Sequence, residues 1–457
     1  MKSKLSLICI LISILMLFSA CKGSEPPENN VNELDHPENT IQPVSDYVLE
    51  TVAVKDDEEL YYDYDYADVE AYPVSVRYGG AELNQGYKSL TLESQRILYK
   101  EMEENVFYIS QESQDGLYDV LGLKLWGVEL TEAEMRQVIV AFSLDKPHIF
   151  WLDNRFGYSN TTGNTVMQLY SFLSAEDIES CSQELNESIK ELHLGLSAEM
   201  SEYDREIYIH DWLIENCNYA DDVVKISDDF LSFTSYGALV NKRAVCEGYS
   251  RAMQLMLATV GIESIPVIGN GNDGLHMWNS VKIENEWYYV DATWNDTERG
   301  SGYDYFNITT EQILYDHTIM PVYSQLTEEQ ICGIDDGVAD SFNVIVPVCS
   351  ATSQNYFVKN SLVISDLDDV AKWNLKSVLR DAQSMLSETV TLSISSDLDY
   401  EDTLDELFYS GEYVFFDCLD AVNEELDGNY IDRNNVSISK KPNLRVVTVI
   451  LQYTDEV

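Results

Sequence analysis

The segment from residue 236 to residue 296 constrains the fold of this chain more than any other part of its sequence. The apolar residues from Tyr249 to Val260 have the spacing of a buried helix, and Gly261 is the residue type that commonly ends one. The apolar residues from Ile265 to Ile268 that follow are typical of a strand. The segment therefore predicts a helix, a tight turn and a strand in direct succession.

Two stretches rich in aromatic and β-branched residues come next, at 276–283 and 287–294. This composition predicts two strands, and the three polar residues between them predict a tight turn. A hairpin with that turn pairs residues whose numbers sum to about 569. His276 and Asp291 fall within one or two positions of this register, so the hairpin should bring an imidazole and a carboxylate together on adjacent strands.

Cys246 lies where the predicted helix begins. Unpaired backbone N–H groups and the helix dipole stabilise a thiolate at such a position. Taken alone, a cysteine there is usually a small buried residue, and a histidine in an aromatic strand is usually a core or surface residue. The three residues together, in one short segment, supply a nucleophile, a base and a group that orients the base. We therefore predict a catalytic site formed by Cys246, His276 and Asp291.

Three motifs in this segment resemble the core of the transglutaminase-like superfamily, most closely its bacterial extracellular branch of the kyphoscoliosis-peptidase type. They are Cys246-Glu-Gly-Tyr-Ser, His276-Met-Trp-Asn and Trp287-Tyr-Tyr-Val-Asp-Ala-Thr-Trp-Asn, and the resemblance covers residues 202–307. It implies an α+β fold with a papain-like cysteine core, in which Cys246 is the nucleophile, His276 the general base and acid, and Asp291 the residue that orients His276.

The same superfamily includes cross-linking acyltransferases, peptidases and amidases, and also members that have lost activity. The resemblance therefore implies a cysteine enzyme that acts on protein or peptide amide bonds through a thioester, by hydrolysis or by transfer to an amine. The alternative is a catalytically silent surface module that binds or scaffolds other molecules. Because all three triad positions are intact, the sequence favours the enzyme.

The N-terminus has the pattern of a targeting segment. Two lysines precede an apolar run from Leu5 to Phe18, and residues 1–20 are predicted to be a signal peptide. The residues from Leu17 to Cys21 resemble a bacterial lipoprotein cleavage box, which implies a lipid on Cys21 and attachment to the extracytoplasmic face of the cell membrane. The alternative is a secreted protein whose cleavage site happens to precede a cysteine. Residues 21–85 are acidic and poor in apolar groups, so we expect a disordered tether.

The remaining residues divide into three predicted parts. Residues 86–200 have mostly helical spacing, with a capping box at Thr131 and a short β-like stretch around Phe156. Residues 201–320 form the predicted transglutaminase-like catalytic domain. Residues 335–457 alternate between strand patterns, at 361–365, 389–395 and 436–453, and helix patterns, at 369–386 and 400–426. They predict a small α+β domain with no recognisable catalytic group. His210 and Asp211 are not expected to form a joint site, since neighbours on a helix point about 100° apart.

Composition restricts the partners. The chain has 28 basic and 80 acidic residues and a formal net charge of −52. Nucleic-acid binding requires clusters of Lys and Arg, so nucleic acid is not an expected partner, whereas a neutral or basic protein, peptide or cell-wall peptide is. No HExxH or CxxC spacing occurs, so no metal or other cofactor is implied. The cysteines other than Cys9, Cys21 and Cys246 are odd in number and irregularly spaced, and they predict no disulfide framework.

Overall fold

The computed structural model describes residues 81–454, apart from 82, 115, 121, 162, 224–225, 227–228, 272–273, 298–299, 320–321, 324–340, 343–344, 411–412 and 426–429. The predicted signal peptide, the lipidation site Cys21 and the tether up to residue 80 lie outside this part of the chain, so they stay predictions. Within it, every helix is too short or too polar to cross a lipid bilayer.

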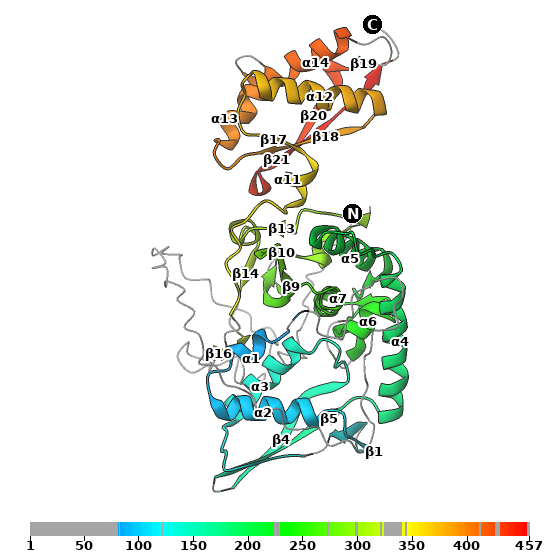
Figure 1. The fold of residues 1–457 in the computed structure, drawn as a ribbon, viewed down its shortest axis with the longest axis vertical. Helices are drawn as coiled ribbons and strands as arrows, with labels where there is room; N and C mark the ends of the chain where they lie inside the picture. The colour runs from blue at the N-terminus through cyan, green and yellow to red at the C-terminus, as the bar shows by residue number, and fades with distance from the viewer. Residues whose placement is uncertain are drawn as a thin grey trace.

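An antiparallel five-stranded sheet forms the centre of the molecule (Figure 1). Its order is β13-β10-β9-β8-β14, with β8 at Ser264–Gly271, β9 at Gly274–Ile283, β10 at Glu286–Val290, β13 at Phe306–Ile308 and β14 at His317–Ile319.

The hairpin between β9 and β10 has the predicted register. Ile283 pairs with Glu286 and Asn279 pairs with Val290. The two turn residues between the strands, Glu284 and Asn285, have φ of 51° and 69°. Positive φ at both positions is the conformation of a two-residue hairpin turn that matches the twist of the strands. The register that the sequence predicted for the hairpin is therefore confirmed.

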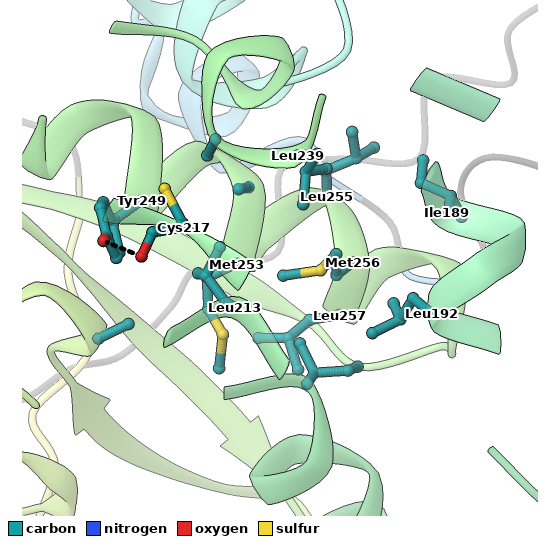
Figure 2. Close-up of a cluster of buried hydrophobic side chains, with 14 of the residues drawn as sticks. Ile189, Leu192, Leu213, Cys217, Leu239, Tyr249, Met253, Leu255, Met256 and Leu257 are labelled. Carbon is teal, nitrogen blue, oxygen red and sulfur yellow. Dashed lines mark hydrogen bonds between the residues drawn. The ribbon is translucent and has the colours of Figure 1, made fainter. Parts of the chain in front are cut away.

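Helix α7, at Cys246–Thr259, is buried along its whole length. It lies between the central sheet on one side and α5 (Glu202–Asn216) and α6 (Ser235–Leu239) on the other (Figure 1). Figure 2 shows Met256 and Leu257 of α7 in the same apolar cluster as Leu192. The helix ends as predicted, because Gly261 adopts a φ of 80° and the next residue donates its N–H back to the Leu257 carbonyl at 2.9 Å.

The N-terminal region was predicted to be mostly helical, and the structure corrects this. Its helices are α1 (Gln85–Ser89), α2 (Glu93–Asn105), α3 (Glu132–Asp145) and α4 (Ala175–His193). It also contains a five-stranded antiparallel sheet made of β1 (Ile109–Gln114), β2 (Leu117–Val120), β3 (Leu123–Trp126), β4 (Leu152–Thr161) and β5 (Asn164–Ser171). The predicted β stretch around Phe156 is part of β4. Strand β1 reads Ile-Ser-Gln-Glu-Ser-Gln, so pairing with β2 rather than intrinsic preference makes it a strand.

The N-terminal region and the core form one packed body. Arg251 of α7 forms an ion pair with Glu247, at 2.8 Å, and donates to the carbonyl and the hydroxyl of Ser143 at the end of α3, each at 2.6 Å. Gln254 Nε2 donates to the carbonyl of Leu144 at 2.9 Å. These bonds fix α3 against the helix that carries Cys246.

The C-terminal domain lies at one end of the molecule (Figure 1). Its sheet has the order β17-β18-β21-β20, with β17 at Leu362–Ile364, β18 at Thr389–Ile394, β20 at Ser437–Lys441 and β21 at Val446–Ile450. The helices are α12 (Asp369–Met385), α13 (Tyr400–Leu404) and α14 (Val414–Glu425). These strands and α12 match the prediction. The single helix predicted from residue 400 to residue 426 is instead divided into α13, a π-helix at Asp405–Tyr409 and α14, and Tyr413, just before α14, has a φ of 48°.

Residues 345–360, which the prediction assigned to the C-terminal domain, contact the core. Cys349 packs in an apolar cluster with Trp278 and Tyr289 of the central sheet. Asn355 Nδ2 lies 3.3 Å from the carbonyls of Phe306 and Asn307, which follow one another at β13.

A buried acid on α5 makes the stability of this core depend on pH. Asn307 Nδ2 donates to Glu206 Oε2 at 2.7 Å, and both side chains are fully buried. Burial raises the pKa of Glu206 to about 8, from about 4.3 in an unfolded chain. Between these values the unfolded chain ionises while the folded chain keeps its proton, so this group lowers the free energy of unfolding as pH rises.

We expect Glu206→Gln to remove this pH-dependent fall in the free energy of unfolding. The glutamine amide can accept from Asn307 Nδ2 and donate to Asn307 Oδ1, as the protonated acid can. Denaturant unfolding should therefore show the variant to be more stable than wild type at pH 8.5 and about equally stable near pH 4. Equal pH dependence of the two proteins would show that Glu206 is ionised in the fold.

Candidate active site

Cys246 is the first residue of α7 and is buried, with an exposed fraction of 1%. Val245 precedes it at the N-cap and has no polar side chain to bind the first N–H groups of the helix. Those donors and the dipole of a 14-residue helix favour negative charge at the cysteine sulfur. Cys246 belongs to an apolar cluster that includes Phe233, Val245 and Val223.

Hydrogen bonds align α7 with β9 in a common direction. Ser250 Oγ donates to the carbonyl of Trp278 at 3.0 Å, and Asn279 Nδ2 donates to the carbonyl of Ser250 at 3.1 Å. One turn further along α7, Gln254 reaches the carbonyl of Ser264, the residue that pairs with Val281 of β9. Helix α7 and strand β9 therefore run in the same direction.

This alignment places the first residue of the helix beside the start of the strand. Cys246 lies one turn before Ser250, about 6 Å along the helix axis. His276 lies two residues before Trp278, about 7 Å along the strand. Cys246 and His276 are thus at the same end of two adjacent elements.

Asp291 holds His276 directly. His276 Nε2 lies 2.6 Å from Asp291 Oδ2, and the carboxylate is completely buried. Since a carboxylate only accepts hydrogen bonds, Nε2 carries the proton and Nδ1 holds the lone pair of the neutral imidazole. That is the tautomer a general base requires.

The predicted second strand of the hairpin is shorter than expected, for a reason that matters at this site. It was predicted to continue to Trp294, but β10 ends at Val290. Asp291 is the N-cap of the short helix α8, at Ala292–Asn295, and its Oδ1 accepts the N–H of Trp294 at 3.1 Å. The cap uses one carboxylate oxygen and leaves the other for His276.

His317 is a further residue of this site that the sequence analysis did not identify. It lies on β14, which pairs with β8, and its Nε2 is 3.2 Å from Asp291 Oδ2. Its Nδ1 is 2.7 Å from Asp316 Oδ1. Burial by itself would raise the pKa of Asp291, but the charges and hydrogen bonds of His276 and His317 hold it well below its usual range. Asp291 is therefore ionised throughout the physiological pH range.

Aromatic rings enclose the histidines. The ring of His276 lies 5.8 Å from Trp278 and 5.6 Å from Trp294, measured between centroids. Trp294 fits because Gly271 has no side chain: a Cβ there would lie 2.7 Å from its Cζ2 atom. Trp278 and Trp294 thus lie at the site, whereas Trp287 packs against the cluster around Tyr289 and Tyr288 packs in the main core.

The donor atoms of His276, Asp291 and His317 lie within 4.8 Å of one another, a spacing that could also accommodate a cation. The separations of 2.6 and 3.2 Å are those of hydrogen bonds, and the N–H groups of both imidazoles point at the same oxygen. The arrangement is therefore complete as a hydrogen-bonded network.

His210 and Asp211, which were not expected to form a joint site, do contact each other. His210 Nδ1 lies 2.9 Å from Asp211 Oδ1, because the imidazole of the first residue can turn toward the carboxylate of the second. His210 Nε2 faces Asn295 Nδ2 at 3.0 Å. The buried contact between His210 and Asn295 joins α5 to α8 and so supports the helix that Asp291 caps.

Comparison with known protein families gave one match. Residues 190–292 match the model of the family described as the transglutaminase-like superfamily, and Cys246, His276 and Asp291 all fall within the match. A comparison with curated proteins gave no match.

The solved structures that are similar to the chain include three proteins of the following kinds. A structure described as a TGase is 14% identical, with a TM-score of 0.22, and the match covers 39% of this chain and 52% of that one. A candidate cysteine protease from Cytophaga hutchinsonii is 12% identical, with a TM-score of 0.21 and coverage of 30% and 61%. A candidate protease from Parabacteroides distasonis is 8% identical, with a TM-score of 0.21 and coverage of 66% and 62%. This chain thus spans between half and two thirds of the length of these proteins. On the family match, the chain contains an α+β domain of the transglutaminase-like superfamily.

Proposed function

We propose that this protein is a cysteine enzyme that cleaves or transfers acyl groups at protein or peptide amide bonds through a thioester. The observation that carries the proposal is the buried pair of His276 and Asp291, with a 2.6 Å hydrogen bond, at the end of β9 that adjoins the N-terminus of α7 and Cys246. A base oriented by a carboxylate, beside a thiol at a helix start, is the arrangement that activates a cysteine.

The proposed reaction begins with proton transfer from Cys246 Sγ to His276 Nδ1. The thiolate then attacks the carbonyl carbon of the amide, and the backbone N–H of Cys246 is positioned at a helix start to donate to the resulting oxyanion. When the C–N bond breaks, His276 gives its proton to the leaving amine, and the acyl group stays on sulfur as a thioester. Attack by water then releases an acid, whereas attack by an amine forms a new amide.

Charge restricts the substrate that we propose. The chain carries a net charge of −52, so a neutral or basic protein, peptide or cell-wall peptide would approach with less repulsion than an acidic one. Lipidation at Cys21 would place the enzyme at the extracytoplasmic face of the cell membrane, where such substrates are present.

Product analysis tests the proposed reaction. We expect incubation of the protein with a mixed peptide library to release new amino termini, and a fluorescent primary amine to label peptides if transfer competes with hydrolysis. Mass spectrometry distinguishes the two products, because hydrolysis adds water and transfer adds the amine. If neither product forms and Cys246 carries no acyl group in the quenched reaction, the chain is a binding module that keeps this fold without turnover.

A further inference from the structure

The imidazole of His317 lies between two carboxylates. Its Nε2 faces Asp291 Oδ2 at 3.2 Å and its Nδ1 faces Asp316 Oδ1 at 2.7 Å. An ionised carboxylate accepts hydrogen bonds and cannot donate them, so each ring nitrogen of His317 has to supply a proton. An imidazole with two N–H groups is a cation.

The surroundings of His317 also favour a cation. The centroids of Trp294, Trp278 and Tyr305 lie 4.3, 4.9 and 5.4 Å from that of His317, and aromatic rings attract cations within about 6 Å of their centroids. Tyr305 also donates from its hydroxyl to Asp316 Oδ2 at 2.6 Å, which holds that carboxylate in place.

The charged and titratable groups around His317 are few among the described residues. His276 approaches from β9 and Asp291 from the N-cap of α8. Tyr305 directly precedes β13, Asp316 directly precedes β14, and β8 presents the uncharged Gly269–Gly271. Burial opposes the charged form, but the hydrogen bonds and charges of Asp291 and Asp316 outweigh it and raise the pKa of His317.

We propose that His317 is a permanently protonated positioning residue that shares Asp291 with His276 and thereby weakens the hold of His276 on its catalytic proton. Both imidazoles use the same oxygen of Asp291, and their ring centroids are 5.5 Å apart. A fixed positive charge at that distance disfavours a second one on His276. His276 would then return its proton to the leaving amine more readily.

This inference rests on the proposed function, so its test measures the protonation of the histidines as well as the reactivity of the thiol. Titration of the protein labelled with ¹⁵N-histidine should show one of its six histidines still doubly protonated at a pH where ordinary histidines have lost their proton, and that signal should disappear in His317→Gln. A signal of His317 that titrates near the usual histidine value of about 6.5 would overturn the inference, whether or not Cys246 is activated.

Two variants test the effect on His276. His317→Gln can still donate to Asp291 but carries no charge, so His276 should lose its proton at a higher pH than in wild type, because a like charge nearby has been removed. Asp316→Asn can present its amide N–H to His317 Nδ1, so His317 should become neutral at a lower pH than in wild type. If His317→Gln does not fold, Asp316→Asn still provides a comparison with wild type that can overturn the inference.

The matched control is His193→Gln, which removes a buried histidine of α4 that bonds to Thr259 Oγ1 at 2.8 Å. It should leave the titration of His276 unchanged. A purely structural role for His317 predicts instead that both site variants lower the melting temperature without shifting His276, and that result would overturn the inference. If His317 is charged but alkylation of Cys246 does not depend on His276, the proposed function fails and the charge assignment stands.

Discussion

Replacement of Asp291 by alanine is expected to lower both the activity and the stability of this protein severely. The variant leaves His276 and His317 buried without their common acceptor and removes the N-cap of α8. Loss of one partner from a buried charged pair costs about 3–5 kcal/mol of folding free energy. Loss of the group that fixes the tautomer of a catalytic histidine lowers kcat by about 10⁴-fold.

Denaturant unfolding and steady-state kinetics on a cleaved peptide check the two effects. Asp291→Asn is the matched variant, because it preserves the shape and can still cap α8 through its amide oxygen. It should therefore recover part of the stability and little of the activity. Near-normal stability of Asp291→Ala would contradict the buried hydrogen-bond network described above.

Replacement of Cys246 by alanine is expected to abolish acyl transfer while leaving the fold intact. The loss of a nucleophile that acts together with its base lowers kcat by about 10⁴–10⁶-fold. The side chain is small and packs among apolar neighbours, so the free energy of unfolding should fall by only about 1 kcal/mol.

Cys349→Ala is the control for this experiment. Cys349 is also buried, and burial raises the pKa of its thiol to about 12, so it stays protonated and unreactive at neutral pH. Its replacement should leave the rate of peptide cleavage unchanged. Equal activity in wild type and Cys246→Ala would show that another residue carries the reaction.

The parts of this site that could be predicted from sequence are set by local rules. A two-residue turn with positive φ fixes the register of the β9–β10 hairpin, and that register brings His276 near Asp291. Helix α7 begins at Cys246 and stops before Gly261, where apolar spacing and glycine indicated its limits.

The parts that could not be predicted depend on contacts between distant residues. His317 reaches Asp291 because the three-residue strand β14 pairs with β8, with His317 opposite Gly271. A strand of that length has no periodicity to detect. The sheet of the N-terminal region was missed for a similar reason, since polar strands such as β1 are defined by their partners. The end of β10 could not be predicted, because Asp291 can either continue a strand or cap a helix. Only the tertiary contacts of its carboxylate decide between the two.

The central claim is that His276 and Asp291 activate Cys246, and the pH dependence of its alkylation by iodoacetamide tests this most directly. Peptide mass spectrometry would compare the full chain with His276→Ala and Asp291→Asn. Because the thiol is 1% exposed, the position of the pH profile is the informative quantity and the absolute rate is not. We predict reaction well below the usual thiol value of about 8.5 in wild type, and loss of that advantage in His276→Ala. The same profile in all three proteins would contradict the account.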